Sequence, residues 1–115
     1  MTQRAETEAE RVGRNDAIFR AANGGIRTAA GDHGLTEAVP FICECADAKC
    51  TEVVRMELAD YERVRAEPTH FINAPGHHGV AVPHARVIDS RDKYDVVEKV
   101  GEAARTAAEL DTRHG

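Results

Sequence analysis

The chain has 115 residues, of which 42% are hydrophobic but only 4% aromatic, and it carries a net charge of −5. This length fits one domain with a small core. Its basic residues are spread along the chain and no apolar run reaches membrane length, which argues against nucleic-acid and membrane partners.

The first predicted element is a helix over residues 4–30. Three apolar residues spaced seven apart define a narrow seam along it: Val12, Phe19 and Ile26. Each of the two glycines at 24 and 25 weakens this helix by about 1 kcal/mol relative to alanine, so a break there is plausible. The Gly-Asp-His-Gly segment at 31–34 is expected to end it.

Short strands and one short helix follow. In chain order we expect strands at 39–45 and 51–58, a helix at 59–67 that stops at Pro68, a strand at 70–74, and a hairpin of 85–90 with 94–100. Within the second strand, Val54 and Met56 share a face opposite Val53 and Arg55. The stretch after Gly101 has only Leu110 as a sizeable apolar anchor, so a poorly packed or frayed tail is expected.

All three cysteines lie within eight positions of one another: Cys43, Cys45 and Cys50. This odd, clustered set is not a disulfide framework, and with no evident signal peptide we expect a reducing, cytoplasmic location. On an extended backbone Cys43 and Cys45 point to one side and Glu44 to the other, while a tight turn at 46–49 returns Cys50 beside them. Three sulfurs supply three corners of a zinc tetrahedron. A redox-active pair and inert buried thiols are the alternatives.

A histidine is the natural fourth ligand for such a site. His77 follows Pro75 and Gly76 in a loop that the preceding strand can carry back toward the cysteines. His78 is its rival, and His84 could also reach the site, although a solvated loop position suits it better. The remaining histidines are expected at the surface: His33, His70 and His114.

A resemblance to a known family is carried by the cysteines and His77 together with several further positions. They are Arg14-Asn15, Phe19-Arg20, Cys43-Glu44-Cys45, Cys50, Tyr61-Glu62, Val64-Arg65, Pro75-Gly76-His77 and Val97-Glu98-Lys99. Together they resemble a family of small bacterial, mainly actinobacterial, proteins over most of residues 14–99. The resemblance implies a zinc site made by Cys43, Cys45, Cys50 and His77. His78 and the Pro-His pair at 83–84 depart from the family pattern, which favours His77. The resemblance implies no activity.

The expected fold is therefore α+β: an N-terminal helix followed by a small antiparallel sheet with one inserted short helix, stapled by a metal site. We divide the chain into an N-terminal helical segment (1–34), a zinc-stapled antiparallel core (35–100) and a C-terminal tail that is partly helical or disordered (101–115). A metal site that links separate segments would add stability that a core with few aromatic residues lacks, because such a core buries little apolar area.

The expected function is that of a small zinc-binding protein-interaction or regulatory module with a structural Cys3His site. Three thiolates and a histidine close the zinc shell, whereas a catalytic zinc keeps one position open. The sequence also has no Gly-rich phosphate loop and no GxSxG or HExxH motif. Whether the protein is an enzyme is left open, leaning to no. The alternatives are a metal-dependent enzyme and a thiol-based redox sensor that releases zinc on oxidation.

The expected partner is another protein, or a second copy of the chain, bound through the N-terminal helix. The seam along this helix either packs on the sheet or pairs with a partner helix. No nucleic acid and no membrane is expected as a partner.

Overall fold

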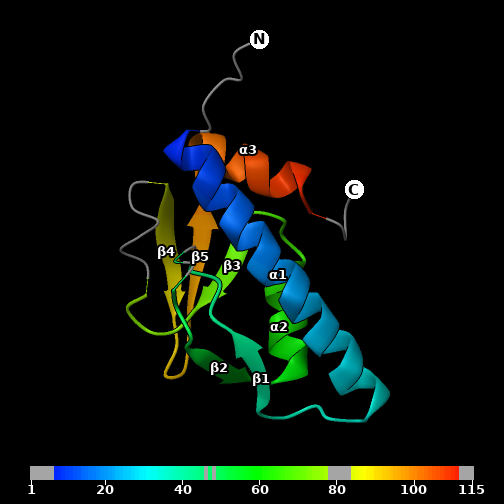
Figure 1. Cartoon of the computed structure of the whole chain (residues 1–115). Helices are drawn as coiled ribbons and strands as arrows, with labels where there is room; N and C mark the ends of the chain where they lie inside the picture. The colour runs from blue at the N-terminus through cyan, green and yellow to red at the C-terminus, as the bar shows by residue number, and fades with distance from the viewer. Residues whose placement is uncertain (1–6, 46, 48, 78–83, 112–115) are drawn as a thin grey trace.

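The computed structural model describes residues 7–45, 47, 49–77 and 84–111. The fold is α+β, as predicted: a long N-terminal helix lies against small antiparallel sheets and two shorter helices (Figure 1). The elements are α1 (Glu8–Asp32), β1 (Val39–Ile42), β2 (Val53–Met56), α2 (Leu58–Arg65), β3 (His70–Asn73), β4 (Ala85–Ser90), β5 (Asp95–Lys99) and α3 (Gly101–Glu109). No helix among the described residues is both long and apolar enough to cross a membrane.

The strands form two sheets instead of the single sheet predicted. β1 pairs with β2, and a second antiparallel sheet has the order β3-β5-β4. The free side of β1 is taken by α1, because the Asn23 side chain accepts a hydrogen bond from the Ile42 N–H at 2.8 Å and donates one to the Ile42 carbonyl at 2.9 Å. The two sheets still meet beyond β1, where the Glu44 N–H donates to the Ile72 carbonyl at 2.8 Å.

α1 begins and ends at clear sequence signals. The Thr7 side chain accepts from the Glu10 N–H at 3.1 Å, and the Glu10 carboxylate accepts from the Thr7 N–H, which makes a capping box. The helix ends at Asp32, and Gly34 takes a left-handed conformation with φ of 70°. The break considered at the two glycines does not occur, since α1 runs through them without interruption.

The buried face of α1 differs from the predicted seam. Val12 is buried, but Phe19 is only half-buried, and the middle of the buried face consists of Asp16, Arg20 and Asn23. These three polar residues follow Val12 at spacings of four, four and three, so they lie on one side of the helix. The seam prediction was wrong there because it counted only apolar residues, whereas this helix buries charges that find partners.

The main core lies between the β1–β2 sheet, α2 and β3. Phe41 stacks on Tyr61 with ring centroids 4.0 Å apart, and both side chains are fully buried. β2 alternates as predicted, with Val54 and Met56 buried and Val53 and Arg55 exposed. The predicted helix is confirmed as α2, and the predicted hairpin as β4 and β5, with an irregular register within β4.

α3 packs through alanines. Ala103 and Ala107 are fully buried, whereas Leu110, the anchor suggested by the sequence, is 46% exposed. α3 crosses the N-terminal half of α1, where Gly13 leaves room for Thr106 (Figure 1). The described part of the tail is therefore packed, in contrast to the frayed tail expected. The division of the chain at residues 34 and 100 stays a prediction.

Candidate metal centre

Four ligand atoms meet beside the sheets. The sulfurs of Cys43, Cys45 and Cys50 and a ring nitrogen of His77 all lie within 4.8 Å of one another. The His77 Nδ1 is 3.9 Å from the Cys43 Sγ and 3.5 Å from the Cys50 Sγ. In a tetrahedral site with zinc-like bond lengths, ligand atoms are separated by about 3.5–3.8 Å. The spacing of this cluster is thus compatible with one metal ion.

The three cysteines reach the cluster from a strand end and a turn. Cys43 and Cys45 follow β1 and are each 3% exposed. Asp47 then organises the turn that returns Cys50: its side chain accepts from the Lys49 N–H and its carbonyl from the Cys50 N–H, both at 2.9 Å. A side chain that bonds the main chain two residues on is a common way to fix a turn.

Glu44 anchors the stretch after β1 that carries two of the cysteines. Its carboxylate is fully buried, and its hydrogen-bond partners lie on α1, α2 and β3. It accepts hydrogen bonds from the Asn23 amide at 2.8 Å, the Tyr61 hydroxyl at 3.2 Å and the Ile72 N–H at 2.9 Å. Burial raises the pKa of Glu44, which the hydrogen bonds from Asn23 and Ile72 oppose. Glu44 therefore fixes the stretch on which Cys43 and Cys45 stand.

His77 is held by a tight turn after β3. Gly76 has a φ of 80°, and the His77 N–H donates to the carbonyl three residues earlier at 2.9 Å. Proline followed by glycine at the centre of a turn favours this geometry. Two side chains fasten the turn: Asn73 donates to the His77 carbonyl at 2.7 Å, and Asp95 of β5 accepts from the Gly76 N–H at 3.0 Å. The imidazole is thus carried by the three-stranded sheet.

The environment of the thiols suits a bound cation. The Ala74 N–H donates to the Cys43 Sγ at 3.1 Å, a contact that favours a thiolate there. Hydrogen bonding with Cys43 lowers the pKa of Cys45 to about 5, whereas the same contact, together with burial, raises the pKa of Cys43. Burial also raises the pKa of Cys50. Sulfurs this close share protons, and a metal ion replaces such protons when it binds.

The described histidines other than His77 lie outside the cluster. His84 is 3.9 Å from a Glu8 carboxylate oxygen, and His70 forms a 3.1 Å contact with Glu98. His33 is exposed at the end of α1. His78 and His114 lie outside the described residues, so the choice between His77 and its neighbour stays a prediction.

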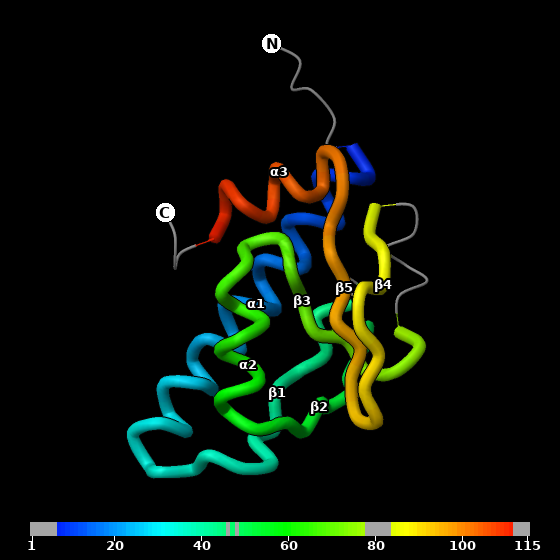
Figure 2. Tube along the Cα trace, turned by 180° about the vertical axis from the view of Figure 1, so that it is seen from behind, coloured from blue at the N-terminus to red at the C-terminus, as the bar shows by residue number. Residues whose placement is uncertain are grey.

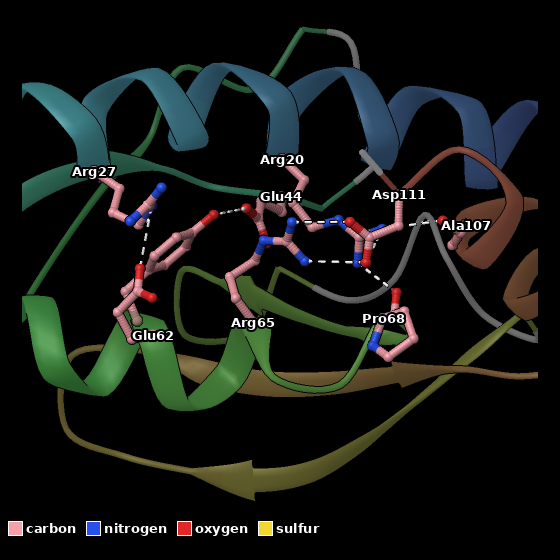
Figure 3. A network of polar contacts seen from close by, with 9 residues as sticks. Arg20, Arg27, Glu44, Glu62, Arg65, Pro68, Ala107 and Asp111 are labelled. Carbon is pink, nitrogen blue, oxygen red and sulfur yellow. Dashed lines mark hydrogen bonds and ion pairs between the residues drawn. The ribbon is translucent and has the colours of Figure 1, made fainter. Parts of the chain in front are cut away.

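A group of buried charges beside the site was missed at the level of sequence. Asp111 bonds Arg65 through two contacts, at 3.0 and 3.3 Å, and lies 3.8 Å from Arg20 (Figure 3). Asp16 and Lys99 form a second ion pair whose side chains are both fully buried. The sequence indicated this group only through the helical spacing that puts Asp16 and Arg20 on the side of α1 that carries Val12. Their partners are distant in sequence, so no local pattern indicated those contacts.

The fold and the cluster together define a class: a small α+β protein with a Cys3His group positioned to bind a metal ion. Comparisons with models of protein families, with curated proteins and with solved structures find no match. The resemblance to the actinobacterial family stays a prediction.

Proposed function

We propose that Cys43, Cys45, Cys50 and His77 hold one zinc ion in a structural role, and that the chain is a small protein-interaction or regulatory module. The observation that carries this proposal is the approach of all four ligand atoms to within 4.8 Å of one another. Three sulfurs and one imidazole nitrogen match the ligands and the tetrahedral number that zinc prefers. Four protein ligands leave no position for a substrate, which favours structure over catalysis.

Burial supports the structural role. Cys43 and Cys45 belong to the main hydrophobic core, beside Phe41 and Tyr61. His77 lies 27 residues beyond Cys50 and comes from the other sheet. A metal held by all four residues would tie the two sheets together across the core. The proposal includes a reducing, cytoplasmic setting, where the three thiols stay available to the metal.

Metal analysis of protein purified under reducing conditions tests the proposal. We expect about one zinc per chain, and cobalt in its place should give the absorption of a tetrahedral thiolate site. A native chain that neither retains nor takes up zinc or cobalt contradicts the proposal. A site that binds metal with a water as fourth ligand would favour the metal-dependent enzyme instead.

The identity of the nitrogen ligand is tested by paired variants. His77→Ala should weaken zinc binding in chelator competition by about 10-fold or more, because it leaves three thiolates and an open corner. His78→Ala should leave the affinity within about 2-fold of the wild type, and His33→Ala is the control for an exposed histidine. A stronger effect of the change at 78 would show that the neighbouring residue is the ligand.

A further inference from the structure

One face of α1 is exposed and free of charge. α1 is 25 residues long and lies on the outside of the molecule, with α2 and β3 on its inner side (Figures 1 and 2). Between Arg14 and Asp32 its exposed residues are Ile18, Ala21, Ala22, Gly25, Thr28, Ala29 and Gly31, which we call the uncharged face. In a chain with 30% charged residues, this stretch of exposed helix is unusual.

The charged side chains between Arg14 and Asp32 do not lie on the uncharged face. Asp16 and Arg20 are buried, and Arg27 lies at the side of the helix, 3.2 Å from Glu62 of α2 (Figure 3). Ile18, by contrast, is 56% exposed. A groove of about 650 Å³ runs beside the face between α1, α2 and the end of α3. The surface therefore offers an apolar projection next to a groove whose lining combines small residues of α1 with charged side chains such as Arg27 and Arg65.

Gly13 and Gly25 of α1 differ in the space that surrounds them. A Cβ on Gly13 would lie 2.9 Å from the Thr106 Cβ and 3.0 Å from the Ala103 carbonyl oxygen, so the close crossing of α3 accounts for this glycine. A Cβ on Gly25 would meet nothing within 4 Å. A glycine in an exposed helix interior costs about 1 kcal/mol relative to alanine. A second helix crossing at Gly25 would account for it in the same way as α3 accounts for Gly13.

The charges at the two ends of the face indicate what that second helix is. Arg11, Ile18, Gly25 and Asp32 are each exposed and lie seven residues apart, so they form one line along the helix. The line is basic at one end and acidic at the other. It is therefore complementary to a copy of itself running in the opposite direction, whereas a parallel copy would place like charges together.

We propose that two copies of the chain pair through the uncharged face of α1 in antiparallel orientation, about a two-fold axis near Ala21 and Ala22. In this register Ile18 of each copy lies over Gly25 of the other, and Arg11 lies opposite Asp32. Every contact occurs twice, as a two-fold interface requires. The dimer extends the proposed function by naming a partner, and it does not depend on zinc.

The expected dimer is weak and reversible. A contact of a few helical turns buries less than the roughly 1,200–2,000 Å² of a standard stable interface. We therefore expect the full-length, zinc-loaded chain to be monomeric at low micromolar concentration and to dimerise below about 500 µM, as measured by sedimentation equilibrium. The same measurement after chelation separates this proposal from the zinc proposal, because pairing through α1 should persist wherever circular dichroism shows a folded chain.

Charge exchange tests the register. Arg11→Asp and Asp32→Arg should each weaken dimerisation by about 5-fold or more, because each places like charges opposite one another twice per dimer. The double variant, R11D/D32R, should restore it. Failure of the double variant to recover while both single variants dimerise less would overturn the antiparallel register.

A matched pair of variants tests the face itself. Ile18→Lys should abolish dimerisation, whereas Ile88→Lys on β4, a residue 43% exposed in the wild type, should leave it unchanged. Circular dichroism verifies that both variants fold. A wild type that stays monomeric up to about 500 µM, or a dimer that survives Ile18→Lys, would overturn the proposal.

Discussion

Glu44 shows how a single buried carboxylate can position a metal site without touching it. Glu44→Ala would leave the donors of Asn23, Tyr61 and Ile72 without their acceptor. A buried donor that loses its acceptor costs about 1–3 kcal/mol. We therefore expect this variant to lose at least about 3 kcal/mol in the free energy of unfolding and to bind zinc more weakly.

Urea unfolding and chelator competition measure the two effects of the Glu44 change. Glu52→Ala is the matched control, since Glu52 is an exposed glutamate on the same stretch of chain. Tyr61→Phe removes one donor only and should have a smaller effect than the alanine variant. Unchanged zinc affinity in a folded Glu44→Ala protein would show that the carboxylate does not position the cysteines.

Asp16 makes stability depend on pH. Burial raises its pKa from the ordinary value of 3.8 to about 7, outweighing the opposing attraction of Lys99. The folded chain thus holds a proton on Asp16 at pH values where the unfolded chain has lost it. The stability this proton contributes is fully present below the unfolded pKa and is lost as pH rises through the folded pKa.

The free energy of unfolding of the wild type, relative to that of Asp16→Asn, should therefore fall as pH rises from 5 toward 7, by at most about 1.4 kcal/mol per pH unit. Above pH 7 this difference should level off. Urea unfolding of the chelated proteins at several pH values measures this difference and keeps metal release out of it. A difference that does not change with pH would contradict the raised pKa.

The cysteine cluster could be predicted at the residue scale because its information is local. Alternation along the strand predicted at 39–45 placed Cys43 and Cys45 on one side, although β1 itself ends at Ile42, and a short turn returned Cys50. The histidine was found from the Pro-Gly turn before it. The anchoring by Glu44 and Asn73 could not be predicted, because their hydrogen-bond partners depend on how α1, α2 and the sheets come together.

At the scale of elements, periodicity predicted the short elements better than the long helix. The alternation in β2, the hairpin of β4 and β5, and α2 all follow from their apolar residues. α1 buries Asp16, Arg20 and Asn23 in the middle of its inner face, and a pattern of apolar residues cannot detect such a face. The split into two sheets was equally hidden, because it depends on Asn23 occupying one edge of β1.

Alanine substitutions at Gly24, which has open space around it, and at Gly13, which packs against α3, should change the free energy of unfolding in opposite directions. Gly24→Ala should raise the free energy of unfolding by about 1 kcal/mol, because a Cβ there meets nothing within 4 Å. Gly13→Ala should lower it, since overpacking against Thr106 and the Ala103 carbonyl costs about 1–3 kcal/mol and exceeds the gain in helix propensity. Thermal unfolding of dilute, monomeric protein measures both. Stabilisation by the change at Gly13 would mean that α3 does not cross there as closely as described.

At the scale of the whole molecule, the two sheets are joined by the core, by the hydrogen bonds between Glu44 and Ile72, and by the proposed metal. The main core has few large side chains, and its aromatic residues are Phe41, Tyr61 and Tyr94. Ligands that come from separate segments couple metal binding to folding. Chelation should therefore lower the melting temperature by about 10 °C or more and loosen the sheets before α1.

Circular dichroism before and after chelation at neutral pH measures this change. The control is His77→Ala, whose melting temperature should already be low and should respond less to chelator. If the metal-free wild type melts at the temperature of the loaded protein, zinc does not hold the fold, and the sensing or catalytic alternatives would gain support.

The crossing of α1 and α3 has a consequence for how the chain folds during synthesis. α1 is synthesised before α3, yet Val12 packs against Ala103, and Arg20 and Arg65 meet their counter-charge at Asp111. Until α3 emerges, Arg20 and Arg65 therefore lack the carboxylate of Asp111, and the N-terminal half of α1 lacks the helix that covers it. Packing of α1 should be completed only once residue 111 has left the ribosomal exit tunnel, and force-sensitive arrest sequences joined after it through linkers of increasing length would locate that step.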